Sequence, residues 1–201
     1  MTMNYIGARI RGFTLIELMV TLTVMTILLV LAVPSITTTI HRNEVSSASN
    51  ALIADLTYAR AEAIDRGTDV SICPSSTGTS CTDGTAYETG WLVYTYTSGA
   101  VINADYNGTK TSNVILRHTT TQTGVSIQSE NAIDITFGPQ GEMKKDGTES
   151  AFDVCYSTGS GVLGQSTTTV PGVWLTVEGS GSTISQSLAA GTSCTGPSPS
   201  T

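Results

Sequence analysis

The sequence is poor in charge, and above all in positive charge. Only 12% of its 201 residues are Asp, Glu, Lys or Arg, about half of the share that soluble proteins usually carry. The nine basic residues are outnumbered by 16 acidic ones, which gives a formal net charge of −7. Because an acidic chain repels the phosphate backbone, general binding to nucleic acid is not expected. Serine and threonine replace the missing charges, and this composition suits a surface exposed outside the cytoplasm.

Residues that commonly hold metals or perform catalysis are also scarce. The chain has two histidines and four cysteines, without a C-x-x-C pair and without a histidine close to any cysteine. His41 and His118 stand in no recognisable catalytic arrangement, and no G-x-S-x-G motif occurs. We therefore expect no enzymatic activity, no cofactor and no metal site, and we expect both histidines at the surface or in an interface.

One long apolar run stands near the N-terminus. Phe13 to Val33 contains a single charged residue, Glu17, and as a helix it measures roughly 30 Å, enough to cross a bilayer. Arg9 and Arg11 precede the run, so the positive-inside rule predicts a cytoplasmic N-terminus and a remainder across the membrane. A cleaved secretory signal is the weaker alternative, because the run is too long and its V-x-A ending fits the cleavage pattern poorly.

Glu17 is costly in such a segment and leads to a functional hypothesis. A carboxylate inside a membrane helix costs about 2.5–3.5 kcal/mol on insertion scales, so its presence indicates a function with a nearby partner. The stretch R-G-F-T-L-I-E-L at 11–18 resembles the processing site of type IV pilins and of type II secretion pseudopilins. This resemblance implies cleavage between Gly12 and Phe13 by the prepilin peptidase of the inner membrane, followed by N-methylation of Phe13.

The spacing of Phe13 and Glu17 suits assembly. Glu17 lies one helical turn below the amine that cleavage would create at Phe13. In an array of parallel helices, the carboxylate of one subunit can therefore meet the amine of its neighbour, which would fix axial register and offset the desolvation of both groups. Pro34, just past the apolar run, also matches the pilin pattern, and its ring is expected to kink or locally melt the helix.

Beyond Pro34 the pattern predicts an amphipathic helix followed by strands. Apolar residues recur at steps of three and four, and Gly67 suits the C-cap of this helix. The stripe, which we expect in a core, consists of Val45, Ala48, Leu52, Leu56, Ala59 and Ala63. Period-two runs predict strands at 70–73, 91–97, 114–117, 125–128, 132–137, 151–156 and 173–177. The predicted fold class is α+β, with a long N-terminal helix packed on an antiparallel sheet and a loose tail from Glu178 onward.

Three segments beyond Pro34 narrow the resemblance to one group within the pilins and pseudopilins. The stretches L-T-Y-A-R-A-E-A-I-D-R-G at 56–67, G-W-L-V at 90–93 and F-G-P-Q-G at 137–141 resemble landmarks of the GspH/FimT group. That group contains minor pseudopilins and minor pilins, FimU among them, and the likeness implies a type IV pilin-like fold. The expected domains are a leader at 1–12, a transmembrane helix at 13–33, an amphipathic helix at 34–67 and a periplasmic head at 68–201.

The resemblance also implies a function. The chain would be a structural subunit of a type II secretion pseudopilus or a type IV pilus, in its initiation or tip complex. The implied partners are other minor subunits, the major subunit, the prepilin peptidase, an inner-membrane assembly platform and membrane lipid. The sequence does not decide between the two filaments. The alternative from a different class is a membrane-anchored periplasmic binding domain that never polymerises.

The four cysteines suit an oxidising periplasm and allow three pairings. We favour a bond between Cys73 and Cys81, which would close a short loop. Cys155 and Cys194 would then staple the C-terminal tail onto a strand.

DNA binding needs separate consideration, because some FimT members bind DNA through an arginine-bearing motif near the C-terminus. In this chain no Lys or Arg follows Lys145, and the matching tail at 191–196 contains no cation. Strong attraction to phosphate comes mainly from Lys and Arg. We therefore expect no strong DNA binding, with at most a weak contribution from Lys144 and Lys145.

Overall fold

The computed structural model describes residues 12–96, 113–130, 134–144, 150–159 and 161–196, without the side chains of 31–35 and of Tyr96. The chain divides into two compact units, Met1–Thr39 and Ile40–Thr201. The amphipathic part of the helix therefore belongs to the same unit as the strands. This unit, residues 40–201, is called the head from here on.

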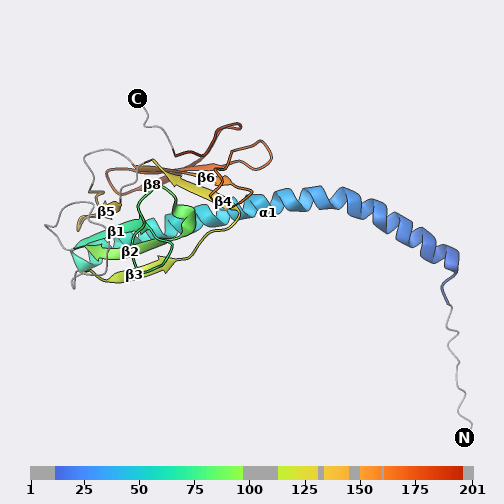
Figure 1. Cartoon of the computed structure of the whole chain (residues 1–201), viewed down its shortest axis with the longest axis horizontal. Helices are drawn as coiled ribbons and strands as arrows, with labels where there is room; N and C mark the ends of the chain where they lie inside the picture. Colours follow the sequence, from blue (N-terminus) through green and yellow to red (C-terminus); the bar gives the residue numbers. More distant parts are fainter. Residues whose placement is uncertain (1–11, 97–112, 131–133, 145–149, 160, 197–201) are drawn as a thin grey trace, which may run out of the picture. The chain divides into compact units, whose positions relative to one another are not determined.

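The described elements are one long helix, a short 3-10 helix and two antiparallel sheets (Figure 1). The helix is α1 (Leu15–Arg66), and the 3-10 helix is η1 (Tyr87–Thr89). The first sheet has the order β3-β2-β1-β5, formed by Ile115–Thr119, Trp91–Tyr96, Asp69–Pro74 and Ile135–Phe137. The second sheet has the order β4-β6-β7-β8, formed by Val125–Ser129, Ser150–Tyr156, Val173–Val177 and Thr183–Ser187. The expected α+β class is thus confirmed.

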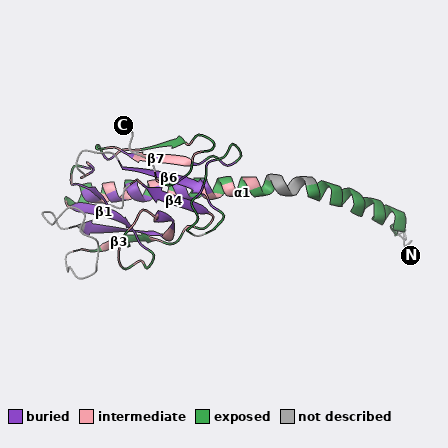
Figure 2. Cartoon of the chain, turned by 45° about the horizontal axis from the view of Figure 1, so that its top comes forward, coloured by how far each residue is buried: buried purple, intermediate pink, exposed green. Residues whose placement is uncertain are grey.

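The C-terminal half of α1 lies between the two sheets, and its apolar stripe is the centre of the core (Figures 1 and 2). All six stripe residues are at most 2% exposed. Their steps of three and four keep them on one face of a 3.6-residue helix. The helix ends at Arg66, and Gly67 follows with φ +61°, the left-handed conformation of a glycine C-cap. The expected stripe and the expected helix end are both confirmed.

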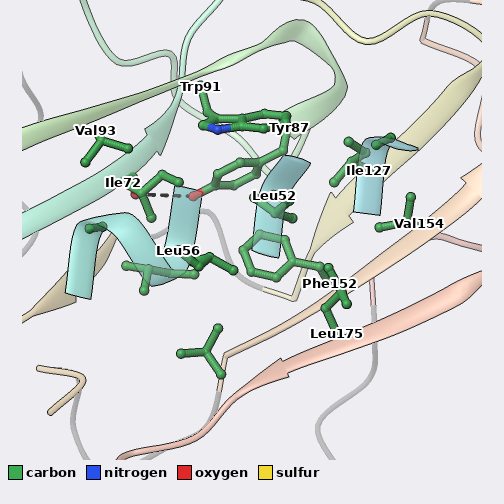
Figure 3. Packing of buried hydrophobic residues seen from close by; sticks show 14 of the residues in the cluster. Leu52, Leu56, Ile72, Tyr87, Trp91, Val93, Ile127, Phe152, Val154 and Leu175 are labelled. Carbon is green, nitrogen blue, oxygen red and sulfur yellow. Dashed lines mark hydrogen bonds between the residues drawn. The ribbon is translucent and has the colours of Figure 1, made fainter. Parts of the chain in front are cut away.

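Side chains from both sheets meet around this helix (Figure 3). Tyr87 packs its ring edge-on against Phe152 with 5.0 Å between ring centroids, which joins η1 to the second sheet. Its hydroxyl donates to the carbonyl of Ile72 in the first sheet at 3.4 Å. Leu52 and Leu56 of α1 fill the space beside these rings, so one apolar cluster serves the helix and both sheets.

Three details differ from the sequence expectation. The strands form two sheets, because β5 returns to pair with β1 whereas β4 pairs with β6. The expected loose tail contains β8, which pairs with β7 along its whole length. Backbone hydrogen bonds hold β8, and its polar, largely exposed side chains carry no period-two signal. The backbone of α1 is helical through Pro34, so the helix is not locally melted there, and a kink at this residue stays a prediction.

Two disulfides fasten the head in the pairing that we favoured. Cys73 is joined to Cys81 with Cα atoms 5.7 Å apart, and Cys155 is joined to Cys194 with Cα atoms 6.1 Å apart. Glycine is needed beside the second bond, because a Cβ added at Gly172 would lie 2.6 Å from the Cys155 sulfur. The residue directly before β7 therefore packs closely on this bond.

We predict that Leu56→Ala lowers the free energy of unfolding by about 2–5 kcal/mol, since it opens a cavity in the apolar cluster that α1 shares with both sheets. Urea unfolding of the full chain in detergent, followed by near-UV circular dichroism, measures the change. Ile64→Ala on the exposed face of the same helix is the matched control and should cost less than about 0.5 kcal/mol. Equal losses for the two variants would contradict this picture of the core.

Candidate functional site

The N-terminal end of α1 is held by a cap that the sequence analysis did not identify. The backbone N–H of Glu17 donates to Oγ1 of Thr14 at 3.2 Å, and the N–H of Leu18 donates to the Thr14 carbonyl at the same distance. The residues T-L-I-E at 14–17 have the spacing of a capping box, with Glu17 at the third helical position. A carboxylate there also meets the positive end of the helix dipole. The cue in the sequence was the Ser/Thr-x-x-Glu spacing itself.

The bond between Gly12 and Phe13 lies outside this helix, which begins at Leu15. The side chain of Phe13 is 83% exposed, and a Cβ added at Gly12 would meet no atom within 4 Å. Both residues of the expected processing site are therefore open to another protein. Glu17 lies in the first turn, and Pro34 is part of the helix backbone, although its side chain is not among those described.

The first turns of α1 expose an apolar surface, which we call the apolar segment, Leu15–Val30 (Figure 2). Most of its large apolar side chains are more than half exposed. The hydroxyls of Thr21, Thr23 and Thr26 donate to backbone carbonyls three or four residues earlier. The polar hydroxyls in the segment are thus satisfied within the helix, and the surface presented to the surroundings is apolar.

Among the described residues, no helix is both long enough and apolar enough to span a bilayer.

In the head, one buried carboxylate ties α1 to the first sheet. Asp55, 4% exposed, accepts hydrogen bonds from Trp91 Nε1 at 2.8 Å, Arg117 Nη1 at 2.6 Å and Thr119 Oγ1 at 2.6 Å. Asp55 raises the pKa of the Arg117 guanidinium, whose Cζ also lies 4.2 Å from the ring centroid of Tyr58. Trp91 is buried. No pattern in the sequence predicts that its indole nitrogen reaches Asp55, which stands off the apolar stripe.

A second buried carboxylate joins η1 to the second sheet. Glu88 is 5% exposed and accepts from the Ile127 backbone N–H at 3.1 Å and from Gln128 Nε2 at 3.0 Å. Burial raises its pKa, which the hydrogen bonds partly counteract. The hydrogen bonds of Glu88 and of Asp55 each hold one element against another. Both carboxylates are therefore structural groups.

The chemistry of the described residues does not suit a metal ion. Ligand atoms of Cys73, Cys81 and Asp134 lie within 4.8 Å of one another. The two sulfurs are bonded to each other, so neither is available as a thiolate. Asp134 accepts a hydrogen bond from the Tyr94 hydroxyl at 2.5 Å.

The cations of the described part of the head are all engaged within the chain. Arg42 donates to the Thr169 carbonyl, and Arg60 donates to the carbonyls of Gly141 and Ser180. Ion pairs join Arg66 to Glu62, Arg117 to Asp55 and Lys144 to Asp69. Lys145 lies outside the described residues. The absence of strong DNA binding stays a prediction from the sequence.

We predict that Asp55→Ala lowers the free energy of unfolding by about 1–3 kcal/mol, because it leaves three donors unpaired, one of them the buried indole N–H. The change should also shift the fluorescence of Trp91. The matched control is Glu62→Gln, which weakens an exposed ion pair on the same helix and should cost less than about 0.5 kcal/mol. If urea unfolding ranks the two variants equally, Asp55 does not hold the helix on the sheet.

Two family models match this chain, one over its N-terminal segment and one over most of the head. The family model described as "Type II transport protein GspH" matches residues 48–187, and that described as "Prokaryotic N-terminal methylation motif" matches residues 7–33. No curated protein matched the sequence.

Among solved structures, the type IV minor pilin FimU of Pseudomonas aeruginosa is 20% identical, with a TM-score of 0.51 over 74% of this chain and 96% of that one. This likeness shows a shared fold. The minor pseudopilin EpsH of the Vibrio cholerae type 2 secretion system is 12% identical, with a TM-score of 0.44 over 72% of this chain and 97% of that one.

The first family model covers more than half of the chain, including the stripe of α1 from Ala48 onward and strands of both sheets. The second covers the Gly12–Phe13 bond, the cap of α1 and Glu17. The chain therefore belongs to the GspH family of minor pilins and pseudopilins and carries their N-terminal methylation motif.

Proposed function

We propose that this minor pilin or pseudopilin is cut between Gly12 and Phe13, methylated at the new Phe13 terminus, and built into a filament through the apolar segment of α1. The observation that carries the proposal is an accessible Gly12–Phe13 bond directly before a capped helix with an exposed apolar surface. The match of the methylation motif to residues 7–33 supports the same processing step.

The apolar segment would be surrounded by lipid before assembly. In the assembled filament it would be surrounded by the same segment of other subunits. In water, exposed apolar area costs about 25 cal/mol per Å², so a continuous surface of this kind needs a cover. Residues 13–33 would hold the subunit in the inner membrane, with Arg9 and Arg11 keeping the N-terminus cytoplasmic. The head would then lie in the periplasm, where its two disulfides can form.

Glu17 gives the assembled helices their register in this proposal. The cap holds the backbone of Glu17 in the first turn of α1. In the filament, its carboxylate would meet the amine that processing leaves on Phe13 of a neighbouring subunit. Both charges lose hydration in an apolar environment, so each is stabilised by the other. The pairing favours one axial offset between subunits over all others.

The partners in this proposal are the prepilin peptidase, the inner-membrane assembly platform, the major subunit and other minor subunits. The filament is either a type II secretion pseudopilus or a type IV pilus. Deletion of the chain, followed by secretion and motility assays, tells these two destinations apart.

We predict that the mature protein begins with N-methylated Phe13. Mass spectrometry of protein purified from membranes that contain the prepilin peptidase should show this terminus, whereas Gly12→Val should leave the leader attached. Mass spectrometry of the Gly12→Val variant controls for nonspecific proteolysis. Recovery of an intact Met1 terminus from the unaltered chain would instead favour an anchored domain that does not polymerise.

We predict that Glu17→Val is inserted and processed normally but enters filaments at least about tenfold less, since a hydrogen bond between charged groups contributes about 1.5–3 kcal/mol. Glu17→Gln is the informative companion, because glutamine keeps the capping box and loses the charge. Filament incorporation is measured by immunoblotting of sheared filaments against membrane fractions. Normal incorporation of Glu17→Gln would assign Glu17 to helix capping and remove it from subunit pairing.

A further inference from the structure

Strand β8 stands at the end of the second sheet, and among the described strands only β7 pairs with it. Hydrogen bonds at both ends of this ladder show which residues are bonded. The N–H of Leu188 donates to the Gly172 carbonyl at 2.9 Å, and the N–H of Glu178 donates to the Ser182 carbonyl at 2.9 Å. Opposed residues of an antiparallel ladder alternate between bonded and non-bonded pairs, and the register between these ends has no shift. The residues of β8 that bond to β7 are therefore the even-numbered ones.

The odd-numbered residues Thr183, Ser185 and Ser187 turn their backbone N–H and C=O groups away from β7. Among the described residues, none of these groups has a hydrogen-bond partner. The side chains of Ser185 and Thr183 lie on the inner face of the sheet, because they stand opposite Leu175 and Val177 of the core. The open edge of β8 is thus a row of alternating donors and acceptors. The group that matches such a row is another extended backbone.

The outer strands other than β8 are covered or protected. Gln128 of β4 forms a bridge with Ala86, and Phe137 of β5 forms a bridge with Met143. The ladder of β3 with β2 contains a register shift, and β3 carries the exposed charge of Arg117. Charges, prolines and bulges are the usual protection of an edge strand against pairing. Strand β8, with the sequence T-I-S-Q-S, has none of these three. Its edge is therefore left open to a partner.

A groove of about 440 Å³ lies beside this edge, between α1 and the last two strands of the second sheet. Ser185 of β8 is one of its lining residues, so the groove lies on the inner face of the sheet. Val45, Ile53 and Val173 contribute apolar surface to it, and Arg42 is the only charged residue in its lining. A lysine or arginine entering the groove would be repelled by Arg42. Apolar side chains therefore suit the groove and basic ones do not.

The open edge and the groove would act on the same residues of an added strand. Every ladder of the second sheet is antiparallel, so an added strand that continues the pattern is antiparallel too. In such a ladder, a residue bonded to Ser185 stands directly opposite it, and the two side chains point to the same face. The residues that donate to β8 are thus the ones whose side chains face the groove. The residues between them face the outer side of the sheet.

We propose that the open edge of β8 binds an extended segment of another polypeptide as an additional antiparallel strand. This segment has β-branched apolar side chains at alternate positions, which face the groove. The open N–H and C=O groups of Thr183, Ser185 and Ser187 supply the main-chain hydrogen bonds, and the groove selects apolar over basic side chains. That the polypeptide is a neighbouring filament subunit rests on the proposed function, whereas strand binding at this edge does not.

The test measures solvent exchange of backbone amides by NMR, on the ¹⁵N-labelled full chain in detergent micelles. The probe is a seven-residue peptide of alternating threonine and valine, acetylated and amidated at its ends. With the peptide in excess over its Kd, exchange at Thr183, Ser185 and Ser187 should slow by the factor 1 + [L]/Kd, at least about fivefold. The amides of Ile184 and Gln186, already bonded to β7, should not change.

Three altered peptides separate the backbone from the side chains. N-methylation of the valine nitrogens removes the donors that face β8 and should abolish the protection. N-methylation of the threonine nitrogens leaves those donors in place and should preserve it. Lysine in place of valine should weaken binding at least about tenfold, because the burial of even one valine is lost.

Two variants of the chain complete the test. Ser185→Pro removes one donor from the open edge and none of the bonds to β7, a position where edge strands accept proline. It should weaken peptide binding at least about fivefold, since a hydrogen bond and close approach of the peptide are lost. Ser185→Thr keeps the N–H and is the matched control. The indole signal of Trp91 should stay in place in both variants and reports that the head remains folded.

Equal binding of all four peptides overturns the proposal, as does protection of even and odd residues alike. Protection that survives N-methylation of valine but not of threonine overturns the antiparallel arrangement. Protection of the odd residues that grows with chain concentration in the absence of peptide identifies a second copy of β8 as the occupant and overturns the proposed partner. Neither processing nor assembly enters this assay, so its failure is distinct from failure of the proposed function.

Discussion

The apolar stripe on the C-terminal half of α1 is shared by both sheets, and the head depends on this shared contact. Leu52 and Leu56 are fully buried, and alanines at 48, 59 and 63 let the strands approach the helix closely. Each sheet buries its inner face against this helix, because the apolar face of a sheet must pack on another element. Hydrogen bonds to Asp55 then fix how the helix is turned against the first sheet. Packing supplies most of the stability, and the buried carboxylate supplies orientation.

Those parts of the fold that depend on local pattern could be predicted from the sequence. The stripe, the glycine after Arg66 and most strands follow from residue spacing, and all of them are in the structure. The division into two sheets depends on which distant strands pair, and a single sequence holds little information on that. Strand β8 was missed for a different reason, since its five residues T-I-S-Q-S are held by backbone bonds to β7 and not by buried side chains.

The candidate functional residues also divide into those that a local pattern reveals and those that it does not. The Gly12–Phe13 bond and Glu17 stand in a contiguous motif, so the sequence located them and the methylation-motif match covers them. The capping bond from Glu17 to Thr14 was overlooked although its spacing is visible. Asp55 and Asp153 could not be found, because burial and partners decide their roles and both residues look like ordinary acidic positions. Asp55 accepts from three donors, and burial raises the pKa of Asp153 to about 6.

The bond between Cys155 and Cys194 has a consequence for where the finished protein can exist. The tail that this bond holds closes one side of the space around Asp153 and Trp174. In a reducing compartment the sulfurs stay apart and the last residues are tied down by hydrogen bonds alone. Oxidation of the two sulfurs is therefore the step that attaches the last described residues covalently to β6.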